Sequence, residues 1–243
     1  MAQVFVVDRT ALFGGAWPHG FQAIGADATP SFLEHALARG RFVDRQEAED
    51  TPDWKQWIPY CVLRCRPATP TGEADPNSLP TGVFRVQRTT KQSEARLHGS
   101  WSIGLGGHVE PEDTLRTGQA TGPDFFAGAL ARELREELDV GHRVPHPRFL
   151  GLVNDDRTAV GRVHAGLVYV WDLIGTLAEA RESVKVREIS KMRGGFGSLV
   201  EFEELWQDPR RFESWSQFLV RSGVLGPMGG LRSAGHPAGT PSP

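Results

Sequence analysis

Two long runs of apolar residues constrain the fold of this 243-residue chain more than any other feature. The run IPYCVLRC covers residues 58–65, and the run VHAGLVYVWDL covers residues 163–173. Both are predicted to be buried strands, and the second is continuously apolar, which is typical of a central strand. Helical patterns alternate with these and other strand patterns along the chain. The order of elements therefore predicts one mixed α/β domain.

Further elements are predicted from alternation, apolar stripes and capping residues. Helices are expected to begin after Ser31 as an N-cap, at Pro123 in a first turn, and after Asp208 as a cap. Residues 67–82 are predicted to form the long tip of a hairpin, and residues 113–124 show no periodicity. The remaining predicted strands are residues 2–9, 83–88, 101–110 and 148–155.

Composition and element order divide the chain into three parts. Residues 1–54 are predicted to form an N-terminal elaboration packed on a main domain of residues 55–225. Residues 226–243 contain five Gly and four Pro and are predicted to be disordered, because they bury too little apolar surface to offset the entropy of ordering.

Cys61 and Cys65 are too far apart in an extended strand to form a disulfide, and they lack the CxxC spacing of redox or zinc sites. They are predicted to be free thiols in a reducing compartment. No apolar run is long enough for a membrane anchor, so a cytoplasmic location is predicted. The seven tryptophans fit either a monomer core or a homodimer interface.

The formal net charge is −3, which argues against a protein that coats extended nucleic acid or an acidic membrane. The charge is unevenly distributed. Residues Glu110 to Asp139 contain eight acids and three bases, a local charge of −5, and the rest of the chain carries +2. The acidity is therefore concentrated in one 30-residue segment.

Within that segment, Glu133, Glu136 and Glu137 lie at i, i+3 and i+4 of the predicted helix and so share one face. Their mutual repulsion suggests a positive partner, and carboxylate oxygens are preferred ligands of Mg²⁺. The alternative is a solvated face with ion pairs such as Arg132 to Glu136. Gly106 and Gly107 precede the helix and favour a ligand site, because glycine permits close approach to the backbone.

These residues resemble the signature of the Nudix hydrolases, which include MutT-like proteins. Gly107 occupies the first glycine position, and residues 132–140 (RELREELDV) follow the second half of the signature. Three departures are present. Asp113 replaces a Glu, eleven extra residues separate it from Arg132, and Asp139 replaces a closing Gly, which is tolerable because Asp adopts left-handed geometry more readily than most residues.

The resemblance implies a mixed β-sheet sandwiched between helices, and hydrolysis of a diphosphate linked to another group. It also implies that Glu133, Glu136, Glu137 and the Gly107 carbonyl bind Mg²⁺ or Mn²⁺. Arg132 would orient the carboxylates, with Asp113 as its partner. The wider pattern around this signature resembles a branch described as MutT-type phosphoesterases.

The general base is left open between a helix glutamate and the loop residues Asp155 and Asp156. The substrate is expected to be a small nucleotide-type diphosphate. Tyr169 and Trp171 are expected in the core, with stacking on a nucleobase as the alternative.

Substrate-binding candidates include the basic segment before the glycines. Arg85, Arg88, Lys91 and Arg96 would clamp phosphates or else lie on a solvated hairpin. His108 would contact substrate or metal, or else be structural.

Two other functions remain open. One is a catalytically silent nucleotide-binding sensor or regulatory module, which the insertion and the changes at Asp113 and Asp139 favour. The other is an isopentenyl diphosphate isomerase, which shares the fold but needs a cysteine in its site. Cys61 and Cys65 match no such motif.

Overall fold

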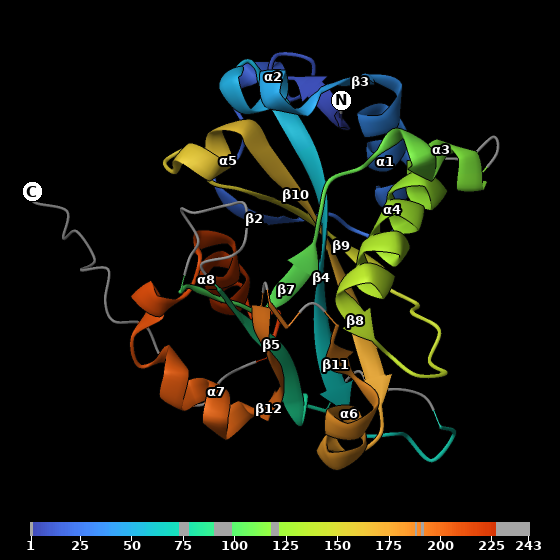
Figure 1. The fold of residues 1–243 in the computed structure, drawn as a ribbon, viewed down its shortest axis with the longest axis vertical. Helices are drawn as coiled ribbons and strands as arrows, with labels where there is room; N and C mark the ends of the chain where they lie inside the picture. The colour runs from blue at the N-terminus through green and yellow to red at the C-terminus, as the bar shows by residue number, and fades with distance from the viewer. Residues whose placement is uncertain are drawn as a thin grey trace, which may run out of the picture.

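One long strand, β4 (Trp54–Arg66), organises the fold in the computed structural model (Figure 1). It pairs in parallel with β10 (His164–Ile174) along its length, from His164 opposite Gln56 to Ile174 opposite Arg66. The structure describes residues 2–72, 78–89, 99–117, 122–187, 189–190 and 192–226. Lys91, Arg96 and nearly all of the predicted tail lie outside these residues.

Ten strands of the described residues form one mixed sheet, in which β10 is central as predicted. The main order is β12-β5-β4-β10-β9-β2, and β1, β7 and β5 pair in turn with the other edge of β4. A separate pair joins β8 to β11. The remaining bounds are β1 (Gln3–Asp8), β2 (Gly20–Ala23), β3 (Gly40–Asp44), β5 (Gly82–Arg88), β6 (Trp101–Ser102), β7 (Gly104–Gly106), β8 (Leu138–Asp139), β9 (Arg148–Asn154), β11 (Lys185–Val186) and β12 (Met192–Ser198).

Helices cover both faces of this sheet. Buried side chains of α1, α4 and α6 join one hydrophobic cluster, and those of α7 and α8 join a second cluster with other sheet residues. The predicted mixed sheet between helical layers is therefore confirmed. The helices are α1 (Thr29–Ala38), α2 (Arg45–Asp50), α3 (Pro111–Thr117), α4 (Gly122–Glu137), α5 (Ala159–Val163), α6 (Leu177–Ser183), α7 (Leu199–Trp206) and α8 (Ser214–Arg221), with 3₁₀ turns η1 (Phe13–Gly15) and η3 (Pro209–Arg211).

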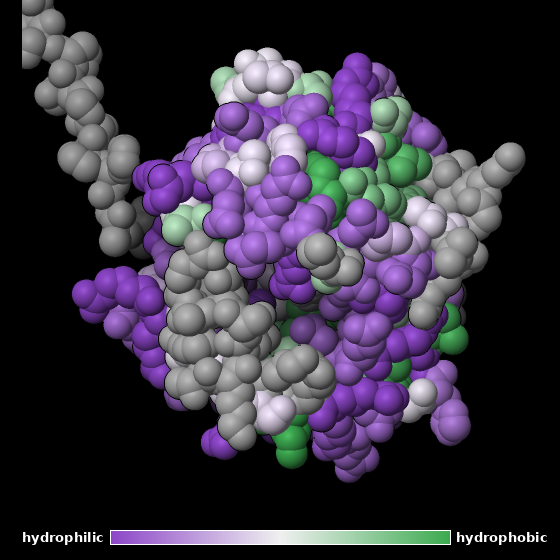
Figure 2. Space-filling view, turned by 45° about the horizontal axis from the view of Figure 1, so that its top comes forward, coloured by the Kyte–Doolittle hydropathy of each residue, from purple (hydrophilic) through white to green (hydrophobic). Residues whose placement is uncertain are grey.

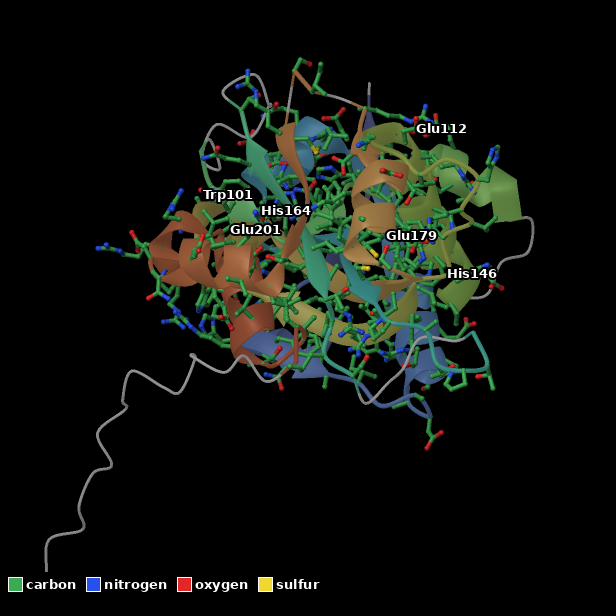
Figure 3. All side chains as sticks on the ribbon, turned by 90° about the horizontal axis from the view of Figure 1, so that it is seen from below. Trp101, Glu112, His146, His164, Glu179 and Glu201 are labelled. Atoms are coloured by element: carbon green, nitrogen blue, oxygen red, sulfur yellow. The ribbon has the colours of Figure 1, made fainter. Side chains whose placement is uncertain are left out.

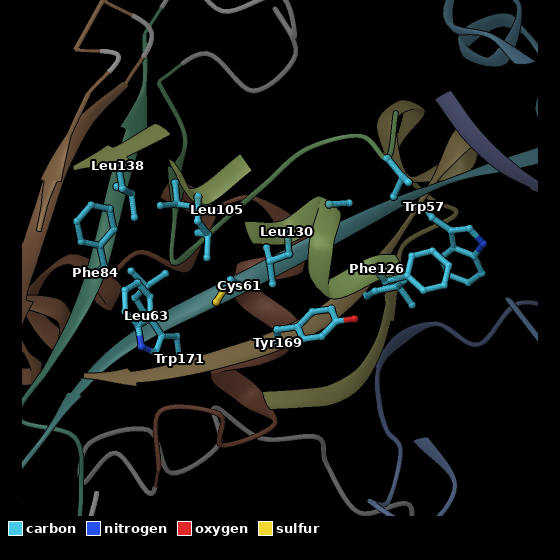
Figure 4. Close-up of a cluster of buried hydrophobic side chains, with 14 of the residues drawn as sticks. Trp57, Cys61, Leu63, Phe84, Leu105, Phe126, Leu130, Leu138, Tyr169 and Trp171 are labelled. Carbon is cyan, nitrogen blue, oxygen red and sulfur yellow. The ribbon is translucent and has the colours of Figure 1, made fainter. Parts of the chain in front are cut away.

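The larger cluster packs the leucine stripe of α4 against the central strands (Figure 4). Leu130 and Leu134 are fully buried, and each such side chain contributes about 1.5–3 kcal/mol through removal from water. Tyr169 and Trp171 belong to the same cluster, which confirms the core alternative. Cys61 and Cys65 are buried free thiols, as predicted.

The N-terminal strands belong to the same sheet as the rest of the chain. Strand β1 pairs with β4, and β2 pairs with β9. Phe5 and Leu33 lie in the cluster that contains the α4 stripe. The division at residues 54 and 55 stays a prediction.

Two predicted helix starts differ from the structure. Helix α1 begins at Thr29, with Pro30 in its first turn, so Ser31 lies inside it. The Asp208 side chain does cap a turn by accepting from the Arg210 N–H, but extended backbone at Phe212 separates η3 from α8. Residues 111–117 are also helical, although no periodicity indicates it.

The face shown in Figure 2 is mainly hydrophilic. Large exposed apolar side chains such as Val144, Ile189 and Val200 come from separate segments. Among the described helices, none combines the length and the apolar character needed to span a bilayer.

Candidate active site

The carboxylate face of α4 lies against Gly107, which follows β7. Strand β7 pairs with β4, with Gly106 opposite Tyr60, and this pairing places Gly107 beside the helix. A Cβ atom on Gly107 would clash with the carboxyl group of Glu133. A side chain at position 107 would therefore displace the Glu133 carboxyl group from its place beside this backbone.

Hydrogen bonds from β1 and from Arg132 hold the backbone of the loop after Gly107. The Phe5 N–H donates to the Val109 carbonyl at 3.0 Å, so β1 lies alongside this loop. The Arg132 guanidinium donates to the His108 carbonyl at 2.8 Å. Two contacts from distant segments thus fix the backbone next to Gly107.

Arg132 is the centre of the site's ion pairs and is only 6% exposed. Its Nε and Nη2 donate to the two oxygens of Asp113 at 2.9 and 3.0 Å, which is a bidentate pair. Its Nη1 donates to Glu133 Oε1 at 2.7 Å and lies 3.5 Å from Glu136 Oε2. The ion pair that the family resemblance implies between Arg132 and Asp113 is present.

The shorter Asp113 reaches Arg132 because α3 carries it to the helix. Asp113 lies in the first turn of α3, and its Oδ2 also accepts from the Glu110 N–H at 2.9 Å. The side chain is fully buried against Arg132. The substitution of Asp for Glu therefore leaves the partner of Arg132 in place.

The described part of the insertion extends α4 at its N-terminus. Helix α4 starts at Gly122, where the backbone N–H donates to the Glu34 carboxylate of α1 at 2.9 Å. A Cβ on Gly122 would clash with the backbone of Leu33. The added residues thus dock on the N-terminal helix.

The three glutamates of α4 differ in exposure. Glu133 is 14% exposed at its side chain and Glu136 is 58% exposed, while Glu137 is half-buried at the end of the helix. Burial raises the pKa of Glu133, the Arg132 charge opposes this, and the nearby carboxylates of Glu136 and Glu110 raise it further. A cation bound here would relieve that repulsion.

These carboxylates and the Gly107 carbonyl form an all-oxygen donor set. Such a set fits Mg²⁺ or Mn²⁺, which prefer oxygen ligands. The space left by the missing side chain of Gly107 holds the Glu133 carboxyl group next to the Gly107 backbone, which also fits a site for such an ion.

Asp139 does not use the left-handed conformation expected for it. It lies in the short strand β8 opposite Lys185, and among the described residues Phe13 is the one non-glycine with positive φ. The left-handed residue is Gly141, with φ of 61°, whose N–H donates to Asp139. The turn is therefore displaced by two residues from the signature position.

The basic candidates of β5 point to opposite faces of the sheet. Phe84 and Val86 belong to the α4 cluster and Val83 to the other, so alternation places Arg88 on the α4 face and Arg85 on the opposite face. Arg85 lies 3.7 Å from the Glu201 carboxylate of α7. The two side chains therefore do not lie on one face, and their proposed phosphate contacts stay predictions.

His108 faces two residues that sequence reasoning missed. Its Nε2 lies 3.3 Å from Nε2 of His164, which in turn lies 3.4 Å from the Glu49 carboxylate. Burial and then the His164 charge lower the pKa of His108 to about 3. No local pattern links these three residues, because they come from three separate segments.

Lys55 is a further missed residue, and it is fully buried. Its ammonium donates to Asn154 at 2.7 Å, to Asp156 at 2.6 Å and to the Gly161 carbonyl. Burial lowers its pKa to about 8, although Asp156 opposes this shift. The sequence does contain a signal for Lys55, because it is a charged residue inside the apolar pattern of residues 54–63.

The loop acids differ in their surroundings. Asp156 accepts from Lys55 and, through both oxygens, from Arg9. Burial opposes these two cations, whose hydrogen bonds and charges hold the pKa of Asp156 at about 2. Asp155 lies 3.5 Å from His19 and accepts from the Arg157 N–H.

Cys61 does not fit the isomerase alternative. Its thiol is fully buried, and burial raises its pKa far above the usual range. A thiol that resists ionisation is a poor nucleophile.

Known proteins resemble the chain in both sequence and structure. Protein YmaB of Bacillus subtilis (strain 168) is 32% identical over 183 residues, which are 74% of this chain and 76% of YmaB. The crystal structure of Tm1382, a candidate Nudix hydrolase, matches 92% of this chain and 98% of its own, with 28% identity and a TM-score of 0.63. A MutT/Nudix family protein from Listeria innocua is more distant, at 17% identity and a TM-score of 0.39 over 63% of this chain and 83% of its own. No protein-family model matches the chain.

Proposed function

Because the chain belongs to the Nudix (MutT-like) hydrolase superfamily, we propose that it is a Mg²⁺- or Mn²⁺-dependent enzyme that cleaves a diphosphate linkage in a nucleotide-type substrate. The observation that supports this best is the packing of Gly107 against Glu133, with Arg132 bridging to Asp113. The departure at Asp113, which favours a silent module, leaves this arrangement intact.

In this proposal, Glu133, Glu136, Glu137 and the Gly107 carbonyl hold the metal. The bound ion supplies Lewis-acid polarisation of the phosphoryl oxygens and a water of lowered pKa. Arg132 fixes the orientation of Glu133, and Asp113 fixes Arg132 in turn. The buried ion pairs hold these side chains in one geometry before substrate arrives.

A helix glutamate fits the role of general base better than Asp156 does. A base must have a free acceptor oxygen and a pKa that allows it to take up a proton. Both Asp156 oxygens already accept from cations, and its pKa is about 2. The α4 glutamates lie in the proposed metal site, and a carboxylate oxygen there that does not bind the metal can accept the proton.

The location and the assembly are also inferred. The two buried free thiols support a cytoplasmic location, because the cytoplasm is a reducing compartment in which thiols stay free. A homodimer remains a prediction.

The proposal is tested with the full chain and a panel of nucleoside diphosphate derivatives, dinucleoside polyphosphates and nucleoside triphosphates. We expect cleavage of a phosphoric anhydride in at least one substrate, inhibition by EDTA and recovery with Mg²⁺ or Mn²⁺. Glu133→Gln should abolish this product. Metal-independent binding without turnover would instead support the sensor alternative.

Replacing Gly107 by Ala is expected to lower kcat by more than about tenfold, because the added Cβ must displace the Glu133 carboxyl group. The added methyl group meets only the end of a flexible side chain, so it should cost no more than about 1 kcal/mol of stability. Steady-state kinetics and urea unfolding measure the two effects. Gly25→Ala is the matched control, since its Cβ would meet no atom within 4 Å. Equal behaviour of the two variants would contradict the assigned role of Gly107.

A further inference from the structure

Glu49, His108 and His164 form a second cluster of potential metal ligands, separate from the three glutamates of α4. Glu49 lies on α2, His108 follows Gly107, and His164 begins β10. One ligand atom from each residue lies within 4.8 Å of those of the other two. We propose that these three residues bind a divalent transition metal of the Zn²⁺ type.

The distances within the cluster fit shared coordination. Nε2 of His108 lies 3.3 Å from Nε2 of His164, and Nε2 of His164 lies 3.4 Å from Oε1 of Glu49. With bonds of about 2.0–2.1 Å to Zn²⁺, two ligand atoms of a tetrahedral site lie about 3.3–3.4 Å apart. Two edges of the cluster therefore already have the length that coordination requires.

The hydrogen bonds of His164 direct its free nitrogen to the cluster. Its Nδ1 lies 2.9 Å from the Val160 carbonyl, and a carbonyl can only accept, so Nδ1 carries the proton. When the ring is neutral, Nε2 is the nitrogen that carries the lone pair, and it faces His108 and Glu49. This backbone contact on the opposite nitrogen is the usual support of a metal-binding histidine.

The backbone of both histidines is held in place. The Lys55 ammonium donates to the His164 carbonyl at 3.3 Å, and Arg132 donates to the His108 carbonyl at 2.8 Å. The ligands therefore need little reorganisation to bind a metal.

The donor chemistry distinguishes this cluster from the site on α4. Two imidazoles and one carboxylate suit Zn²⁺ or Fe²⁺, whereas the all-oxygen set of α4 suits Mg²⁺ or Mn²⁺. Three protein ligands leave a fourth position for water. The Glu49 side chain is 24% exposed, so solvent reaches the site from α2. A bound ion would join the N-terminal segment to the loop that presents Gly107.

The experiment uses the full chain, stripped with a chelator and then saturated with Mg²⁺ to occupy oxygen-donor sites. Titration with Co²⁺ is followed by visible absorption, because four-coordinate Co²⁺ absorbs much more strongly than six-coordinate Co²⁺. We expect one equivalent of strongly absorbing Co²⁺, displaced by Zn²⁺. Zn²⁺ should also raise the Tm, since it binds the folded state.

Two variants remove ligands, and two are controls. Glu49→Gln and His108→Asn should each weaken Co²⁺ and Zn²⁺ binding by more than about tenfold. His146→Asn changes an exposed histidine that lies well away from His164 in Figure 3. This variant should bind Co²⁺ and Zn²⁺ as tightly as the wild type does. The Glu133→Gln, Glu136→Gln double variant should also bind normally, even where hydrolysis is lost.

The outcomes separate this site from the proposed catalytic site. Absence of the strong Co²⁺ absorption in the wild type would overturn the proposal. So would unchanged binding in both Glu49→Gln and His108→Asn, or loss of binding in the double variant. In the first two cases the histidine contact and the Glu49 ion pair are structural only, and the assignment of the α4 glutamates is unaffected.

Discussion

Replacing Glu136 by Gln is expected to lower kcat for diphosphate hydrolysis by about 100- to 1000-fold, which corresponds to a loss of several kcal/mol of transition-state stabilisation. Glu136 is 58% exposed and is 3.5 Å from Arg132, so its carboxylate has no role in the core. The substitution removes one negative charge from the face proposed to hold the metal and keeps the side-chain shape. Steady-state kinetics at saturating Mg²⁺ measure the effect.

The matched control is Glu204→Gln, which changes an exposed glutamate on helix α7. Both variants should retain the wild-type free energy of unfolding to within about 1 kcal/mol, because both side chains are exposed and an ion pair of an exposed carboxylate, such as that of Glu136 with Arg132, contributes little. A Glu136→Gln enzyme with near wild-type kcat would show that Glu136 does not hold the metal. The other α4 ligands would then need reassignment.

Replacing Arg132 by Met is expected to lower the free energy of unfolding by about 3–5 kcal/mol, since removing one partner of a buried ion pair leaves an uncompensated charge. The Asp113 carboxylate is fully buried and accepts from two Arg132 nitrogens, and Glu133 accepts from a third. Methionine retains much of the side-chain volume, so lost packing contributes little. Urea unfolding at neutral pH measures the change.

Arg135→Met is the control for this substitution. Arg135 lies on the same helix but is exposed, and its loss should change stability by no more than about 0.5 kcal/mol. Adding Asp113→Asn to Arg132→Met should destabilise less than the sum of the single changes, because the two residues interact directly. Equal effects of Arg132→Met and Arg135→Met would contradict the central role given to Arg132.

The main strands were predictable because their patterns are local. The uninterrupted apolar run of β10 indicates a strand covered on both faces, and the α4 leucines recur every four residues. Several short helices were missed, two of them although their sequences carry capping boxes. Thr176 with Glu179 begins α6, and Ser198 with Glu201 begins α7.

Strand β12 was not predictable in the same way. Its sequence MRGGFGS contains three glycines, which weaken strand propensity. It forms because β5 supplies a partner from Gly82 to Arg88. A Cβ on Gly194 would clash with the Arg85 carbonyl, so this pairing depends on glycine rather than on a hydrophobic pattern.

The carboxylate face and the Arg132–Asp113 pair followed from motif spacing, but the surroundings of the site did not. The docking of Gly122 on Glu34 joins residues 88 positions apart, and the contact of His108 with His164 joins residues 56 apart. Such contacts depend on how distant segments pack. The sequence pattern around each residue contains no sign of its partner.

The parallel pairing of β4 with β10 also sets the order in which the molecule can be assembled. Each strand residue pairs with one 108 positions later, as Arg64 does with Asp172. A large loop must therefore close before the two strands can form hydrogen bonds with each other. Folds that depend on such distant strand pairs fold slowly. During synthesis, the edge of β4 that pairs with β10 has no partner until the chain has been synthesised to residue 174, the end of β10. While these 108 residues are being added, the apolar run of β4 has an unpaired strand edge, and such edges are prone to aggregation.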